Sequence, residues 1–162
     1  MTAFEIRRAA AHDIPLLAGH RAAMFRDMGS VHRDAEAPLI RATDEYLRRA
    51  LPSGEYLAWV AESAGAAREV IGGAGVQLRT ILPRPGAGGA GIELGPEAIV
   101  LNVYVVPAWR RRGVAQALMQ TLLATLAERK VRRIVLHASD AGRRLYERLG
   151  FEATNEMRLK TR

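Results

Sequence analysis

The 162-residue sequence contains no cysteine, which excludes disulfides, thiolate zinc sites and a cysteine nucleophile. No apolar run approaches the roughly 18 residues that a membrane span requires. The N-terminal stretch has an early acidic residue and no long apolar core, so it is unlike a secretory signal peptide. We therefore expect one domain over residues 1–162, in the cytoplasm and without membrane contact.

Two phosphate-binding motifs are also missing. The sequence has no Gly-x-x-x-x-Gly-Lys-Ser/Thr loop and no Gly-x-Gly-x-x-Gly after a strand, which disfavours P-loop and dinucleotide folds. Aromatic residues make up only 6 % of the chain, and only Trp109 adjoins the densest arginine cluster, which disfavours a nucleic-acid-binding surface with stacked bases. The histidines have no zinc-like spacing, so we expect no metal site.

Positive charge is plentiful. The formal net charge is +7, and arginine supplies 22 of the 24 basic residues. Arginine forks match phosphate and carboxylate geometry, so the charge favours an acidic partner or a phosphorylated ligand. Composition alone favours the simpler interpretation, in which the charge is solvated surface.

The apolar pattern predicts a mixed α/β domain. Strands are expected over residues 3–9, 55–63, 68–82, 98–106, 132–138 and 151–160. Helices are expected from His12 or Asp13 to Met28 and over residues 38–50, 112–128 and 141–150. Residues 83–95 are rich in glycine and proline and are expected to form a flexible, functional loop. Together they predict a mostly antiparallel central sheet of about six to seven strands flanked by about four helices.

Three arginines precede a helix start, where the helix dipole is already positive. Gly113 permits a tight turn there, and the first amides of the helix have no internal partners. These amides and the dipole form an anion site, and Ala115 is small enough to admit a phosphate. The arrangement is understandable if a pyrophosphate binds at this helix end.

Two stretches carry a family resemblance. The segments "VLNVYVVPAWRRRGVAQALM" and "LHASDAGRRLYERLGF" resemble the GNAT superfamily of acyl-CoA-dependent N-acetyltransferases. The cofactor signature of that family, Gln/Arg-x-x-Gly-x-Gly/Ala, stands here as Arg110, Arg111, Arg112, Gly113, Val114 and Ala115.

The resemblance implies a role for each matching position. The backbone amides of residues 111–115 would hold the pyrophosphate of acetyl-CoA, and Val103, Tyr104 and Val105 would pair with its pantetheine arm. An N–H of this strand would stabilise the oxyanion. Tyr146 would be the general acid that protonates the departing thiolate, with a core tyrosine as the simpler alternative. Ser139 would either contact the cofactor or cap a helix.

The acceptor and the base are less defined. Acceptor pockets of the family lie over segments that correspond to residues 24–38 and 83–95, where Phe25, Met28 and Glu36 are candidates. Asp27, Asp34 and Glu36 would suit a cationic amine. Glu36, Glu93 and Glu97 are the candidate bases, although each is also typical of solvated surface. Asn102 stands where other members carry glutamate, and it would orient water or substrate.

The expected function is transfer of an acetyl group from acetyl-CoA to a primary amine of a small molecule or peptide. Pairing as a homodimer is a further expectation from the family. Two other functions remain open at this stage, an acyl-CoA-binding regulatory domain without turnover and a basic nucleic-acid-binding module.

Overall fold

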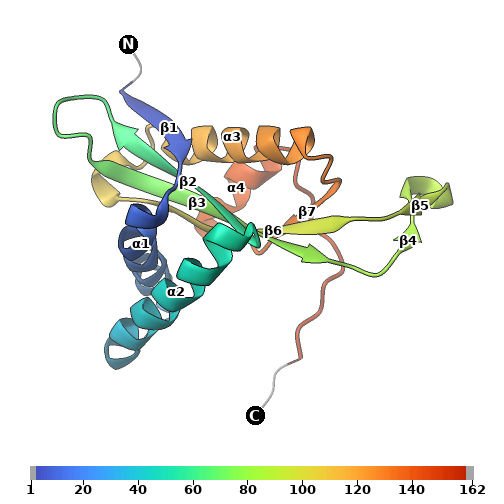
Figure 1. Ribbon diagram of the computed structural model, residues 1–162, viewed down its shortest axis with the longest axis horizontal. Coiled ribbons are helices and arrows are strands. Elements are labelled where there is room, and N and C mark those ends of the chain that lie inside the picture. Colours follow the sequence, from blue (N-terminus) through green and yellow to red (C-terminus); the bar gives the residue numbers. More distant parts are fainter. Residues whose placement is uncertain (1–2, 160–162) are drawn as a thin grey trace.

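The computed structural model describes residues 3–159, and its main feature is a sheet of five strands in the order β1-β2-β3-β6-β7 (Figure 1). The strands are β1 (Phe4–Arg8), β2 (Tyr56–Ser63), β3 (Val70–Thr80), β6 (Pro96–Val105) and β7 (Arg133–Leu136). The first four are antiparallel to their neighbours, and β7 runs parallel to β6. The mixed α/β fold predicted from the sequence is confirmed.

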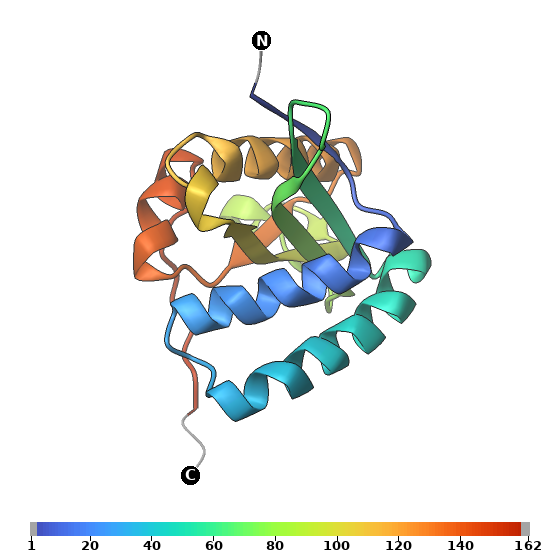
Figure 2. The same cartoon turned by 90° about the vertical axis from the view of Figure 1, so that its left-hand side faces the viewer.

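Helices cover both faces of the sheet. The helices are α1 (Ile14–Asp27), α2 (Arg33–Ser53), α3 (Val114–Glu128) and α4 (Asp140–Arg148), with short 3₁₀ turns η1 (Ala11–Asp13), η2 (Ala87–Gly89) and η3 (Pro107–Trp109). Figure 2 shows α1 and α2 side by side on one face, with α3 on the other. No helix among these described residues is long and apolar enough to cross a membrane.

The strand β2 shows why its sequence is apolar without a break. Tyr56, Ala58 and Val60 pack against α1 and α2, whereas Leu57 and Trp59 belong to the core that α3 covers. Successive strand side chains point to opposite faces, so a strand covered on both sides needs apolar residues at every position.

The helix α2 is longer than predicted at both ends. It begins at Arg33, before Pro38, and continues through Pro52 to Ser53. A proline inside a helix removes its own N–H donor and its ring crowds the carbonyl four residues earlier, but the other helical hydrogen bonds remain. The helix ends at Gly54, whose φ of 77° is the left-handed conformation typical of a helix end.

The predicted strand over residues 151–160 is wrong for the part that the structure describes. Residues 151–159 have no regular secondary structure, and Lys160 lies outside the described residues. Met157 and Leu159 are 94 % and 84 % exposed. Alternating residues form a strand only when a neighbouring strand pairs with them, and β7 offers just four residues. The central sheet therefore has five strands, fewer than expected.

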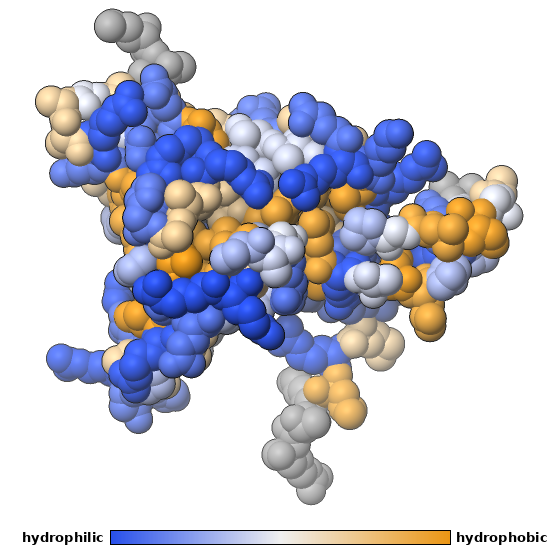
Figure 3. Space-filling model, in the orientation of Figure 1, coloured by the Kyte–Doolittle hydropathy of each residue, from blue (hydrophilic) through white to orange (hydrophobic). Residues whose placement is uncertain are grey.

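Residues 83–95 form a small arm rather than an irregular loop. Two short strands, β4 (Arg84–Pro85) and β5 (Ile92–Glu93), pair in it, and Arg84 Nε and Nη2 donate to Glu93 Oε2 at 3.0 and 2.9 Å. The arm projects from the body of the molecule, and its apolar side chains are visible at the surface in Figure 3. Leu82, Ile92 and Leu94 are the exposed large apolar residues there.

Candidate active site

A β-bulge lies in the middle of β6. Leu101 pairs with Gly75 and Tyr104 pairs with Gly73, so two residues of β6, Asn102 and Val103, lie opposite Ala74 alone. Asn102 has a φ of 58°, a left-handed conformation that asparagine tolerates better than most side chains. A bulge of this kind interrupts the hydrogen-bond ladder and redirects the backbone.

The strands β6 and β7 separate just before this bulge. Their parallel pairing ends at Val100 and Leu136, whereas β6 continues to Val105. From Leu101 onward, β7 no longer pairs with this edge of β6. An extended ligand can add to such an edge as an extra strand. The segment Val103, Tyr104 and Val105, expected to bind pantetheine, lies on this part of β6.

The chain then turns into α3 through two left-handed residues, Arg111 with a φ of 62° and Gly113 with a φ of 81°. The first amide that bonds within the helix is that of Ala117, which donates to the carbonyl oxygen of Gly113 at 3.0 Å. Val114 and Ala115 therefore have no helical acceptor for their amides. A turn of this shape at a helix N-terminus is an anion-binding concavity, so these residues fit a diphosphate.

Two of the three arginines, Arg110 and Arg112, contact different partners. Arg110 Nε donates to the carbonyl oxygen of Val105 at 3.0 Å, and its guanidinium forms an ion pair with Asp27 of α1. The hydrogen bond to Asp27 raises the pKa of Arg110. Arg112 lies over the ring of Trp109, 5.2 Å from its centroid. Arg110 thus connects α1 to the end of β6, a contact that the sequence does not reveal.

Tyr146 is held by α4 and by the segment that follows it. Its ring meets the edge of the Phe151 ring at a centroid distance of 6.0 Å, and burial raises the pKa of its phenol. A Cβ at Gly142 would lie 2.9 Å from the Tyr146 ring, so glycine makes room for the tyrosine. Tyr146 also lines a cavity of about 730 Å³ between β7, α4 and residues 151–156.

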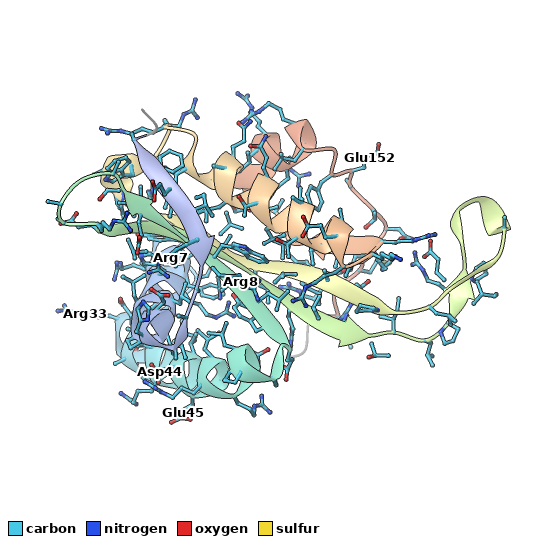
Figure 4. The ribbon with its side chains drawn as sticks, turned by 45° about the horizontal axis from the view of Figure 1, so that its top comes forward. Arg7, Arg8, Arg33, Asp44, Glu45 and Glu152 are labelled. Atoms are coloured by element: carbon cyan, nitrogen blue, oxygen red, sulfur yellow. The ribbon has the colours of Figure 1, made fainter. Side chains whose placement is uncertain are left out.

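Ser139 is the N-cap of α4. Its Oγ accepts a hydrogen bond from the amide of Gly142 at 3.2 Å. The structure shows the capping contact of Ser139, and its contact with the cofactor stays a prediction. Figure 4 shows the side chains around the sheet, including Glu152 on the segment after α4.

A polar cluster surrounds the bulge. Asn102 Nδ2 donates to Tyr56 Oη at 2.9 Å, and Asn102 Oδ1 accepts from Arg21 Nη1. Burial raises the pKa of Tyr56. Near the same strand, the His20 ring lies 5.0 Å from the Tyr104 ring, and burial lowers the pKa of His20 to about 4. His20 Nδ1 has no hydrogen-bond partner among the described residues.

Sequence reasoning missed Arg21 and Tyr56 as site residues. Arg21 belongs to α1 and Tyr56 to β2, so each is far from Asn102 along the chain. Tyr56 follows the apolar pattern of its strand, and one arginine among 22 carries no signal of its own.

The acidic candidates are already paired. Glu36 forms an ion pair with Arg26, and Glu93 forms one with Arg84. Glu97 is only 1 % exposed and lies between Arg79 and Arg133. Burial would raise the pKa of Glu97, but its hydrogen bonds to the two arginines outweigh this and lower it. The expectation that Glu97 is a solvated residue is therefore wrong.

The expected acceptor-site residues Phe25 and Met28 both lie near the end of α1. The guanidinium of Arg21 stacks on Phe25, 4.9 Å from its ring centroid. Met28 is 47 % exposed, large for an apolar side chain. The structure thus brings Phe25 close to the polar cluster at the bulge and leaves Met28 at the surface.

An enzyme that transfers an acyl group needs a binding place for an extended, phosphorylated donor. The open edge of β6 and the amides at the start of α3 fit such a donor. The class that fold and site define is therefore an acyltransferase.

A family model described as an acetyltransferase (GNAT) domain matches residues 54–153. Because this match covers more than half of the chain, the protein belongs to the GNAT family of acetyltransferases. A search of curated proteins gave no match.

Solved structures agree with this assignment. A GCN5-related N-acetyltransferase from Ralstonia eutropha JMP134 is 34 % identical, with 98 % of each chain covered and a TM-score of 0.84. A predicted acetyltransferase from Clostridium acetobutylicum, solved with acetyl-CoA, is 26 % identical, with 98 % of this chain and 96 % of that chain covered and a TM-score of 0.79. Glucosamine-6-phosphate N-acetyltransferase from Arabidopsis thaliana shares the fold at 14 % identity, with 99 % of each chain covered and a TM-score of 0.69.

Proposed function

We propose that the protein transfers the acetyl group of acetyl-CoA to a primary amine of a small molecule or peptide by direct attack in a ternary complex. Acetyl-CoA supplies an acetyl group activated as a thioester. The amides of residues 111–115 hold its diphosphate, and the edge of β6 at Val103–Val105 aligns its extended arm. The observation that carries the proposal is the open edge of β6 beside the unpaired amides at the start of α3.

The proposed reaction assigns a task to each group. The amine first loses its extra proton to water, and its nitrogen lone pair then forms a bond to the acetyl carbonyl carbon. A backbone N–H of β6 stabilises the oxyanion, an effect usually worth a few kcal/mol. The carbon–sulfur bond breaks, the thiolate takes the phenol proton of Tyr146, and the remaining extra proton on the nitrogen passes through water to the phenolate, which restores Tyr146 and leaves the neutral amide. Asn102, fixed by Arg21 and Tyr56, orients the water or the acceptor.

The experiment measures thiol release from acetyl-CoA with a panel of primary amines. Replacing Tyr146 with phenylalanine removes the proton donor but keeps the ring packing, so kcat falls by about 10²-fold or more while KM for acetyl-CoA stays nearly constant. Tyr46→Phe is the matched control, because it removes only the hydroxyl that donates to Glu55 Oε1 at 2.9 Å and keeps the ring that packs against Tyr56. An unchanged kcat in Tyr146→Phe refutes the assigned acid.

The raised pKa of Tyr146 gives this assignment a pH signature. Because burial keeps the phenol protonated above its ordinary range near pH 10, the acid stays available throughout neutral and mildly alkaline solution. The kcat of the wild-type enzyme therefore does not fall between pH 7 and pH 9.5, a window chosen to lie below that ordinary pKa. A decline in kcat across this interval would assign the proton to a more acidic group.

Binding without turnover is the competing outcome. If calorimetry detects acetyl-CoA binding while no amine in the panel releases thiol, the regulatory alternative replaces the enzymatic proposal. If neither acetyl-CoA binding nor thiol release occurs at millimolar acetyl-CoA, the enzymatic proposal and the regulatory alternative are both wrong. The cytoplasmic location remains a prediction.

We also propose that two copies of the chain associate. The exposed apolar side chains Leu82, Ile92 and Leu94, at or beside the projecting arm, support this, because exposed apolar patches often mark an interface. Light scattering after size-exclusion chromatography measures the mass. A monomeric mass at micromolar concentration contradicts the pairing, and a dimer that dissociates in Ile92→Glu supports it.

A further inference from the structure

We propose that the acceptor amine carries an anionic group, a carboxylate or a phosphate, that binds the guanidinium of Arg21 beside the bulge of β6. This inference rests on the proposed function and adds the chemical class of its acceptor. It follows from the position of Arg21, from the groups that surround it and from the proton that the amine must lose.

Arg21 is fixed at the bulge. It comes from α1, is partly buried, and donates through Nη1 to Asn102 Oδ1. The ring of Phe25 lies under its guanidinium, 4.9 Å away. These two contacts hold the group in one place and engage one of its nitrogens. The other two nitrogens form the edge that binds two oxygens of an anion at once.

Arg21 has no carboxylate partner among residues 3–159. Within the described part of the chain, no ion pair includes Arg21, whereas Arg26 and Arg110 on the same side of the molecule each have one. A partly buried charge without a counter-ion is costly, so a ligand that supplies the counter-ion gains affinity from it.

The surroundings do not favour a cationic acceptor. Asp27 is paired with Arg110, and Glu36 is paired with Arg26. These are two of the three acids that the sequence offered as receptors for a positive amine. His20, on the same helix as Arg21, is uncharged at neutral pH because burial lowers its pKa to about 4. The groups beside Asn102 are therefore neutral or positive.

An anchored anion also suits the chemistry. Arg21 of α1 reaches Asn102 from the face of the sheet that α1 covers. The edge of β6 from which β7 separates after Val100 is a different side of the bulge. An acceptor held by its anion can approach the bulge from the α1 side while the donor occupies the strand edge. The positive guanidinium nearby lowers the pKa of the ammonium and so assists loss of its proton to water.

The test compares amines that differ only in charge. Each amino acid is assayed beside its carboxamide, and each phosphorylated amino alcohol beside the free amino alcohol, with a polyamine as the cationic case. The anionic member of a pair should have a kcat/KM about tenfold higher or more. The two anionic series distinguish a carboxylate from a phosphate acceptor. Equal values within every pair overturn the inference.

Two substitutions assign the preference to Arg21. Arg21→Gln keeps a donor for Asn102 but removes the charge, so it should abolish the preference for the anionic member of each pair, whereas Arg21→Lys should keep part of it. Arg41→Gln is the matched control, since Arg41 is an exposed arginine of α2 that lies outside the predicted acceptor segments. A preference that survives in Arg21→Gln refutes the assignment.

Binding gives a second readout that needs no turnover. Calorimetry of the preferred anionic amine with the wild-type protein and with Arg21→Gln should show a loss of affinity of about tenfold or more. Failure of this inference is distinct from failure of the proposed function. If neutral and anionic amines are acetylated equally well, the protein is an acetyltransferase but the anion site is wrong. If no amine is acetylated, the proposed enzymatic function is wrong.

Discussion

At the scale of single residues, Asn102 could be predicted as a site candidate from the sequence, but its contacts could not. Its polar side chain interrupts an apolar strand pattern, so it is recognisable as a candidate from the sequence alone. Its hydrogen-bond partners, Arg21 and Tyr56, come from two other elements. Neither partner has a local pattern that marks it, because contacts between distant positions depend on the completed fold.

Gly75 protects this cluster by having no side chain. A Cβ there would lie 1.8 Å from Tyr56 Oη, so Gly75→Ala must displace the tyrosine and, through it, Asn102. We expect a loss of about 1–3 kcal/mol in unfolding free energy, typical of overpacking, together with a lower kcat. Urea denaturation and the thiol-release assay measure the two effects.

The control for Gly75→Ala is Gly19→Ala. Gly19 lies within α1, and a Cβ there would meet nothing within 4 Å. Alanine favours a helix over glycine by about 1 kcal/mol, so this variant should be as stable as the wild type or more so, with kcat unchanged. If Gly75→Ala behaves in the same way, Tyr56 does not position Asn102.

At the scale of elements, the predictions succeeded where a residue pattern is local. The strand β6 and the helix α3 follow from one continuous apolar run, a proline and an amphipathic segment, all adjacent in sequence. The strand predicted over residues 151–160 failed because strand formation needs a partner that the local pattern cannot supply. The bulge in β6 was equally invisible, since it exists only in the register with β3.

The turn before α3 depends on Gly113. Its φ of 81° costs an L-residue roughly 1–2 kcal/mol, so Gly113→Ala should destabilise the fold or shift the turn. Because the amides that we propose bind the diphosphate lie on both sides of this residue, KM for acetyl-CoA should rise by about tenfold, and KM for the amine should change less. Steady-state kinetics with each substrate varied in turn measures both values.

Gly54→Ala provides the comparison for that variant. Gly54 has a φ of 77° and ends α2, so the backbone strain is the same but lies at a helix end without a proposed ligand. We expect a similar loss of stability and an unchanged KM for acetyl-CoA. Equal changes in KM for the two variants would show that α3 has no special role in binding the donor.

At the scale of the whole molecule, two buried carboxylates connect elements that are distant in sequence. Asp13 is 4 % exposed and accepts from Arg7 Nη1 and Nη2 at 2.8 and 2.9 Å, and Arg7 Nε in turn donates to Glu62 of β2 at 2.7 Å. Arg7 and Arg8 occupy neighbouring positions of β1 (Figure 4). Glu97 makes the corresponding link between Arg79 of β3 and Arg133 of β7.

The sequence could not identify these links. An isolated acid among many arginines is typical of solvated surface, and only the fold shows that Asp13 and Glu97 are buried. Burial alone would raise the pKa of each carboxyl, but hydrogen bonds from the arginines, and from the amide of Ala10 for Asp13, outweigh it and lower the pKa. Both groups therefore bind protons less readily in the folded state than in the unfolded state.

This difference predicts how stability depends on pH. Since the unfolded chain binds more protons, the contribution of each carboxylate is complete above the unfolded pKa near 4 and is lost as pH falls through the lower folded pKa. The stability of the wild type, measured as its thermal unfolding temperature, should thus fall steeply below about pH 4. Asp13→Asn and Glu97→Gln should each cost about 2 kcal/mol at pH 7 and should each flatten the decline in acid. The exposed Glu45→Gln should keep the wild-type slope, and equal slopes for all four proteins would mean that general charge repulsion, rather than these two links, unfolds the molecule in acid.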